Sequence, residues 1–272
     1  MRFCLLTFLF CAGMIVSPAA AQDQPNLFSS DVSRFDLGRQ AVYRIYTESD
    51  PPRSFKNSSG NLTGSSVEIV QELLNRLGRV EAIEMRSWSE AYRFLTQGPN
   101  TILFSVARTK EREGMFKWVG PLSQSKLQLF ARAGGSPAGV KDPAAWKTSR
   151  VITVQGWYSE SYLRENGYQN IITLSSPSLA LQKLMDGAGD YLCLPELSTA
   201  GAVLFNHLDN DKLVKVSNLE TVPLYIAFSG DVPDETIKKW QDTLDQMIKD
   251  GFVSRNQQKW VNIYLRATGA KQ

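Results

Sequence analysis

Short apolar runs alternate along the chain with stretches in which apolar residues recur every three or four positions. The recurrence of Val67, Val70 and Leu74 on one face predicts a helix over 67–77, and the run 101–106 predicts a buried strand. Strands that alternate with helices favour parallel sheets covered by helices on both faces. Ligands of such sheets bind where the strands end. The alternation therefore indicates an α/β fold suited to binding a small ligand.

The other elements are predicted from the same periodicities and from residues that start or stop helices. Ser87-Trp88-Ser89-Glu90 is a capping box and predicts a helix start, whereas Gly251 predicts a helix stop. Further strands are expected at 42–47, 126–132, 150–155, 170–174, 190–194, 213–216 and 222–228. Further helices are expected over 159–166, 233–249 and 256–264, and two more open at Asp142-Pro143 and Ser176-Pro177.

A glycine-rich segment near the middle, 133–139, indicates a crossover between two lobes. We expect one discontinuous lobe from 40–131 and 222–272, and a second lobe from 132–221. Two crossovers, near Ala131–Gly135 and Asn218–Pro223, would connect the lobes. In such an arrangement the strand ends of both lobes can face each other across a cleft.

The N-terminus has the features of a secretory signal peptide. Arg2 precedes a mostly apolar stretch, 3–16, and the small residues Ala19-Ala20-Ala21 follow. A membrane anchor is the alternative, but the stretch is shorter than the ~20 residues that a spanning helix needs. We therefore expect a signal peptide at 1–21, a lead-in at 22–39 and a soluble mature protein in the periplasm.

Composition excludes several classes of function. Of the three cysteines only Cys193 lies beyond the expected cleavage site, so no intramolecular disulfide is expected. The 30 Lys and Arg residues nearly balance the 27 Asp and Glu residues, which leaves no basic footprint for nucleic acid. His207 is the single histidine, so a histidine-rich metal site is excluded. We expect no cofactor and no metal.

The segment around the predicted strand 101–106 carries the sharpest signal. It reads Ser105-Val106-Ala107-Arg108-Thr109-Lys110-Glu111-Arg112, and an aromatic-rich stretch, 116–121, follows it and ends in proline. Together with Gly60-Asn61-Leu62-Thr63-Gly64 and Val154-Gln155-Gly156, it resembles the family 3 extracellular solute-binding proteins, the periplasmic receptors for polar amino acids and related compounds. The resemblance spans nearly all of 40–265. It implies a two-lobed, type II periplasmic-binding-protein fold with two hinge crossovers and a ligand cleft between the lobes.

The resemblance implies that Arg112 binds the carboxylate of the ligand. A guanidinium group is always charged and matches a carboxylate with two parallel hydrogen bonds. Ser105 and Ala107 align with turn residues that assist through hydroxyl or amide groups. Arg108 either adds a second cation at the cleft edge or faces solvent.

Other positions of the site are implied less directly. Asp50 and Phe55 follow the first strand, where the family has an acidic and an aromatic side chain, although turn and core roles are the alternatives. Trp88 is either a wall over the ligand or a core residue. Beyond Gly156, Trp157 and Tyr158 come before Ser159, and we expect Tyr158 and Ser159 to contact the ligand.

The family typically places an aspartate after the strand 190–194 to bind an α-ammonium group. Here Pro195 occupies that position, and Glu196 stands next to it. Either Glu196 takes over the ammonium, or it is an ordinary residue of a helix start and the ligand is a carboxylate without an ammonium.

These features predict a monomeric protein that captures a small polar ligand, closes around it and delivers it to an ABC permease in the inner membrane. No catalytic residue is expected, since the sequence has no nucleophile elbow and no phosphate-binding loop. Two alternatives remain open. One is a dehydratase-like periplasmic enzyme on the same fold, and the other is a ligand sensor for a membrane receptor.

Overall fold

The computed structural model describes the backbone of residues 41–268 and the side chains of residues 41–263. The expected signal peptide, 1–21, and the lead-in, 22–39, lie outside the described residues. Among the described helices, none combines the length and the apolar character that crossing a bilayer requires.

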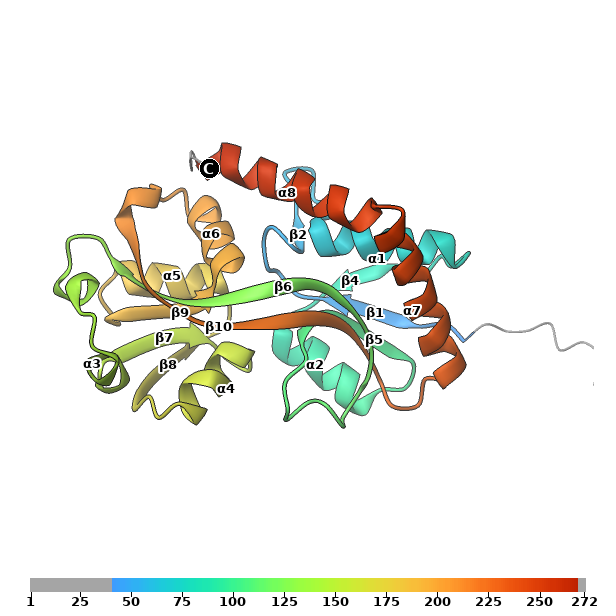
Figure 1. Cartoon of the computed structure of the whole chain (residues 1–272), viewed down its shortest axis with the longest axis horizontal. Coiled ribbons are helices and arrows are strands. Elements are labelled where there is room, and N and C mark those ends of the chain that lie inside the picture. Colours follow the sequence, from blue (N-terminus) through green and yellow to red (C-terminus); the bar gives the residue numbers. More distant parts are fainter. Residues whose placement is uncertain (1–40, 269–272) are drawn as a thin grey trace, which may run out of the picture. The chain divides into compact units, whose positions relative to one another are not determined.

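In the described residues, ten strands form one large sheet and one small one (Figure 1). The strands are β1 (Arg44–Thr47), β2 (Phe55–Lys56), β3 (Leu62–Thr63), β4 (Ile83–Met85), β5 (Thr101–Ala107), β6 (Lys117–Arg132), β7 (Arg150–Val154), β8 (Asn170–Leu174), β9 (Tyr191–Pro195) and β10 (Leu213–Phe228). The large sheet has the order β4-β1-β5-β10-β6-β9-β7-β8, and β2 pairs with β3 alone.

Eight α-helices accompany the strands in the described part of the chain. They are α1 (Ser65–Arg76), α2 (Trp88–Gln97), α3 (Pro143–Thr148), α4 (Tyr158–Glu165), α5 (Pro177–Met185), α6 (Glu196–Phe205), α7 (Asp234–Lys249) and α8 (Phe252–Thr268). Figure 1 shows α1 and α2 on opposite sides of the β1–β5 half, and α5 and α4 on opposite sides of the β7–β9 half. Helices thus cover both faces of the sheet, as the alternation predicted.

The long strands β6 and β10 join the two halves of the sheet. They run antiparallel along almost their whole length, while β10 also pairs with β5 and β6 with β9. The strands outside this ribbon pair in parallel within each half, so the sheet is mixed rather than purely parallel.

The ribbon corrects two expectations. Strand 126–132 begins already at Lys117, and the strands expected at 213–216 and 222–228 are one continuous strand, β10. The polar residues between the two expected strands are typical of turns. In the structure β10 nevertheless pairs with β6 through this stretch, and the pairing contains three register shifts. The residues of β6 that pair with β9 begin at Leu127, ahead of the glycine-rich segment 133–139.

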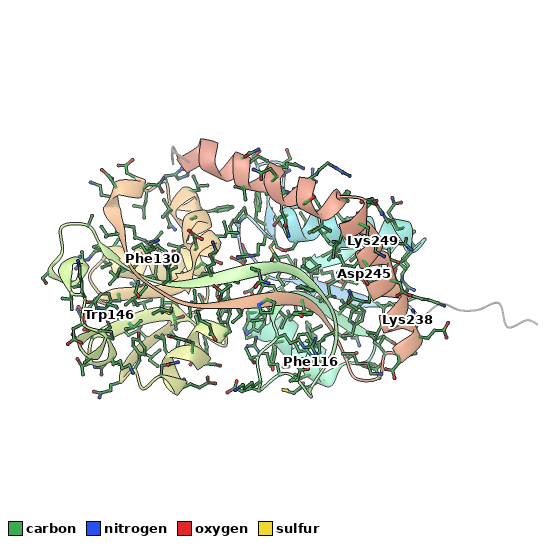
Figure 2. The ribbon with its side chains drawn as sticks, viewed as in Figure 1. Phe116, Phe130, Trp146, Lys238, Asp245 and Lys249 are labelled. Carbon is green, nitrogen blue, oxygen red and sulfur yellow. The ribbon has the colours of Figure 1, made fainter. Side chains whose placement is uncertain are left out.

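Packing on the two halves follows the amphipathic patterns. On α7, Trp240, Leu244 and Met247 are buried, and Trp240 packs edge-on against Phe228 with ring centroids 5.2 Å apart. Figure 2 shows Lys238 and Lys249 pointing away from the sheet on the opposite face of α7, and Phe130 and Trp146 inside the other half.

The capping box predicted at Ser87 is present at the start of α2, since Ser87 and Glu90 bond reciprocally. By contrast, the extent of α6 was not predicted, although a helix start at Glu196 was one of the two alternatives for that residue. Its residues are mostly small or apolar, and the side chains of Ser198 through Val203 are all buried, so no polar face marks it in the sequence.

Candidate functional site

A pocket lies where strands from both halves of the sheet end. Its empty volume, which includes space open to solvent, is about 320 Å³. The lining combines acidic, basic, hydroxyl and aromatic side chains. They come from the ends of β1, β5 and β9, from the first residues of α2 and α4, and from the β6–β10 ribbon. These residues are Glu48, Asp50, Arg53, Trp88, Ser105, Ala107, Arg112, Ser125, Trp157, Tyr158, Pro195 and Leu224.

The loop after β1 supplies three of the charged groups. It is closed by reciprocal backbone hydrogen bonds between Asp50 and Ser54, of 2.8 and 3.0 Å. Two glycines let other segments approach it closely. A Cβ atom at Gly64, whose φ is 129°, would lie 2.2 Å from the carbonyl oxygen of Arg53, and a Cβ at Gly201 would lie 2.0 Å from that of Pro51. Only glycine fits at these two contacts.

Arg53 and Asp50 form a buried ion pair in this loop, with 3.0 Å between Nη1 and Oδ2. The residues are only 2% and 7% exposed, respectively. Arg53 also donates to Ser198 Oγ at 3.1 Å and, at the limit of a hydrogen bond, to Ser125 Oγ at 3.5 Å. Its Nε and the Oδ1 atom of Asp50 are buried without a hydrogen-bond partner among the described residues.

Arg112 is the second buried cation of the pocket, and it is 6% exposed. It donates to the carbonyl oxygens of Gly156 at 2.9 Å and Ala107 at 3.3 Å. Its guanidinium carbon lies 5.0 Å from the ring centroid of Trp88 and 5.3 Å from that of Tyr92, within cation–π range. Burial lowers the pKa of Arg112, because desolvation disfavours the charged form.

No carboxylate oxygen of the described residues lies within 4.0 Å of the Arg112 guanidinium group. In this respect Arg112 differs from Arg53, whose charge Asp50 compensates. A buried cation is costly unless an anion reaches it. The pocket therefore holds one arginine with capacity for an external anion.

Glu48 brings a carboxyl group to the same pocket and accepts a hydrogen bond from Trp157 Nε1 at 2.9 Å. Burial and, secondarily, the charge of Asp50 raise the pKa of Glu48 well above its usual value, although Trp157, Arg112 and Arg53 oppose the shift. Part of the residue stays accessible to solvent. Glu48 is thus a carboxyl group that holds its proton more readily than an ordinary glutamate.

Ser105 owes its orientation to a β-bulge. In the pairing of β5 with β10, Val106 and Phe104 face consecutive residues of β10, which leaves Ser105 unpaired with a φ of 63°. Bulges often re-aim a side chain beside a site, and a left-handed serine costs about 1–2 kcal/mol. The buried Ser105 Oγ has no hydrogen-bond partner among the described residues.

Six of the ten residues predicted to bind the ligand line this pocket. They are Asp50, Trp88, Ser105, Ala107, Arg112 and Tyr158. Tyr158 bonds through its hydroxyl to Ser125 Oγ at 3.1 Å, and burial raises its pKa. Trp88 is at the same time a core residue, packed with ring centroids 5.3 Å from Tyr92.

The other four predicted residues do not line the pocket. Arg108 pairs with Glu113 and lies over the rings of Trp118 and Tyr225. Phe55 packs edge-on against Phe205 and Trp260.

Ser159 is buried and bonds to Thr153 Oγ1 at 2.7 Å, so its hydroxyl is already satisfied inside the second half. Glu196 is the first residue of α6 and lines a separate surface hollow together with Lys126 and Glu220. The pocket receives Pro195 instead.

Several lining residues were not among the predicted binding residues. No binding role was assigned to Glu48, Arg53, Ser125, Trp157 or Leu224. The position of Arg53 in a loop with two prolines gives no local sign of burial, because its partners Ser125 and Ser198 are 72 and 145 residues away. No group of three or more His, Cys, Asp or Glu side chains suited to a metal occurs in the part of the chain that the structure describes.

A mixed α/β sheet with a charged pocket at the strand ends of two halves defines a ligand-binding protein of the periplasmic-binding-protein class. Residues 43–263 match the model of the bacterial extracellular solute-binding proteins, family 3, and the chain belongs to this family. The predicted family and fold class are thereby confirmed.

Named relatives match this chain at low sequence identity. The L-cystine-binding protein TcyJ of Escherichia coli K12 is 24% identical over 220 residues, which cover 77% of this chain and 78% of TcyJ. A histidine kinase sensor domain with similarity to periplasmic binding proteins matches with a TM-score of 0.74 and 21% identity, over 82% of this chain and 97% of that one. The ancestral amino acid-binding protein AncCDT-1, described as a precursor of cyclohexadienyl dehydratase, matches with a TM-score of 0.70 and 22% identity, over 83% and 97%.

Proposed function

We propose that this protein binds an amino acid or a related small carboxylate, with Arg112 as the carboxylate ligand, and delivers it to an ABC transporter. The observation that carries the proposal is the buried Arg112 guanidinium group in the pocket, which has no carboxylate partner among the described residues. An arriving carboxylate supplies the missing anion and can form two charge-assisted hydrogen bonds.

The acidic groups of the pocket support an amino acid rather than a plain carboxylate. Glu48 and Asp50 both line it, whereas Glu196 lies in a separate hollow. We infer that an α-ammonium group would bind to the Glu48 carboxylate, so that Pro195 does not abolish ammonium recognition. The names of TcyJ and of AncCDT-1, both described as binding amino acids, agree with this inference.

We further propose that the two expected lobes, 40–131 with 222–272 and 132–221, close over the ligand by bending of the β6–β10 ribbon. Four hydrogen bonds of lining residues join the expected lobes at the pocket. They run from Trp157 to Glu48, from Arg112 to the Gly156 carbonyl, from Arg53 to Ser198 and between the hydroxyl groups of Ser125 and Tyr158. Ligand contacts from both sides would add to these bonds and shift the population toward the closed form.

The expected signal peptide and the family support export to the periplasm, where a monomer would meet an inner-membrane permease. The likeness to a histidine kinase sensor domain keeps a receptor role as the second candidate for the same binding event. Neighbouring genes distinguish the two, since permease and ATPase genes indicate transport and a sensor kinase gene indicates signalling.

Titration calorimetry of the exported protein, residues 22–272, tests the binding function. We expect one or more α-amino acids to bind, and Arg112→Ala to weaken binding by about 2–5 kcal/mol, because it removes a buried charge-assisted pair. Arg150→Ala is the matched control, since Arg150 pairs with Asp190 away from the pocket. Unchanged affinity in Arg112→Ala would exclude Arg112 from the site.

Glu48 is the observation that favours the enzyme alternative. A carboxyl group with a raised pKa inside a pocket is suited to acid–base chemistry. We propose binding without turnover. NMR spectra of the ligand after long incubation with stoichiometric protein should show it chemically unchanged, and the appearance of a product would favour the enzyme.

A further inference from the structure

The Arg53–Asp50 ion pair has polar atoms without hydrogen-bond partners, and these atoms could bind a second group of the ligand in the pocket. The Nη1 atom of Arg53 is occupied by Asp50 Oδ2 and Ser198 Oγ. Its Nε has no partner among the described residues, and its Nη2 makes only the 3.5 Å contact with Ser125 Oγ. These two nitrogens share one edge of the guanidinium plane, the edge that can hold an acceptor group.

Asp50 presents the complementary atom. Its Oδ1 is a buried acceptor without a described partner, whereas Oδ2 is bonded to Arg53. A buried polar atom that lacks a hydrogen bond is rare in a folded protein and destabilises it. The pair therefore offers one unused donor edge and one unused acceptor, both on residues that are more than nine-tenths buried and line the pocket.

The pair is also separate from the carboxylate site at Arg112. The described hydrogen-bond partners of Arg112 are the carbonyls of Ala107 and Gly156, and it shares none of the partners of Arg53. Because Asp50 compensates the charge of Arg53, a ligand group that reaches both should itself be neutral overall. A purely anionic group would face Asp50, and a purely cationic group would face Arg53.

We propose that the Arg53–Asp50 pair is a second subsite, which binds the far end of the ligand through a neutral group that carries an acceptor and a donor side by side. A carboxamide has this chemistry, and so does an ammonium–carboxylate group at the far end of a diamino dicarboxylic acid. The inference rests on the proposed function, since Arg112 holds the near end.

Titration calorimetry with length-matched amino acids tests the subsite on the unmodified exported protein. L-Glutamine carries a carboxamide and L-cystine carries a second ammonium–carboxylate group, whereas L-norleucine, L-glutamate and L-lysine end in apolar, anionic and cationic groups. We expect glutamine or cystine to bind at least about 100-fold more tightly than each of these three, because an analogue leaves the polar pair unsatisfied. The stronger of the two identifies the group.

The paired variant Arg53→Met with Asp50→Asn removes both charges together, so neither is left buried alone. We expect it to lose the preference for glutamine or cystine while its affinity for norleucine changes by less than about threefold, because the Arg112 site is untouched. Arg150→Met is the control arginine, and thermal unfolding of each variant verifies folding.

Two results would overturn the subsite. One is an unmodified protein that binds norleucine, glutamate or lysine as tightly as both glutamine and cystine, a comparison that needs no variant. The other is a folded paired variant that loses affinity equally for all five amino acids, as a purely structural ion pair would. In either case Arg112-dependent binding of amino acids would leave the proposed function intact, whereas no binding of any amino acid would refute both proposals.

Discussion

The contact between α6 and the loop after β1 can be perturbed by adding one carbon atom to Gly201. Gly201 lies within α6, and an added Cβ would be 2.0 Å from the carbonyl oxygen of Pro51 and 2.6 Å from its carbonyl carbon. Ordinary van der Waals contacts of a Cβ begin at 3.4 Å, so Gly201→Ala requires a backbone displacement of more than 1 Å. The displaced loop carries Asp50 and Arg53, two groups of the pocket.

The expected magnitude follows from two opposing effects. Overpacking of a well-packed contact costs about 1–3 kcal/mol, which corresponds to about a 5- to 150-fold loss in an equilibrium constant. In the interior of a helix, however, alanine is favoured over glycine by about 1 kcal/mol. If α6 and the loop separate when the proposed lobes open, the clash weakens ligand binding, while the ligand-free protein gains the helix propensity.

Calorimetry and denaturant unfolding of the same preparation distinguish these effects. We expect Gly201→Ala to bind ligand at least about tenfold more weakly and to unfold, ligand-free, at the same or a slightly higher denaturant concentration. Gly230→Ala is the matched control, because its Cβ would meet no atom within 4 Å. Undiminished affinity in Gly201→Ala would refute the idea that the ligand-bound protein holds α6 against this loop.

Two further predictions concern stability. Ser87→Ala removes the capping box of α2 and should lower the free energy of unfolding by about 1 kcal/mol in denaturant titrations, and no loss would show that the box adds nothing. Glu48→Gln tests the raised pKa of Glu48. Between about pH 4.3, the usual glutamate pKa, and the raised pKa of Glu48, the folded protein keeps the proton that the unfolded chain has lost. The free energy of unfolding therefore falls as pH rises through this window, by at most about 1.4 kcal/mol per pH unit. The slope is smaller where water reaches the carboxylate. Relative to Glu48→Gln, the unmodified protein should therefore weaken across this window, and parallel pH curves would contradict the shift.

The elements that the sequence predicted well depend on neighbours in the chain. The capping box needs only Ser87 and Glu90, three residues apart, and the buried face of α1 repeats within two turns. Strand 170–174 and the cap at Ser176 were predicted at the observed residues for the same reason. The family and the importance of the segment 105–112 also came from a local pattern of residues.

The tertiary structure decided which polar residues face the pocket. Arg108 and Arg112 lie four residues apart in the same charged segment, yet Arg112 is buried against Trp88, and Arg108 pairs with Glu113 outside the pocket. The sequence likewise did not predict that β10 is continuous. Its middle residues are polar, and they are extended because they pair with β6.

Arg53 is the clearest case of this division. Nothing within a few residues of it indicates burial, and its loop reads as a solvent-exposed turn. Ser125 of β6 and Ser198 of α6 become its neighbours only when distant segments pack around the loop, for which Gly64 and Gly201 leave the space. The sequence alone determined the family, the helix caps and the carboxylate-binding candidate Arg112. The burial of Arg53 and its bonds to Ser125 and Ser198 came from long-range packing, because the burial of a charge is set by the segments that surround it rather than by its neighbours in the chain.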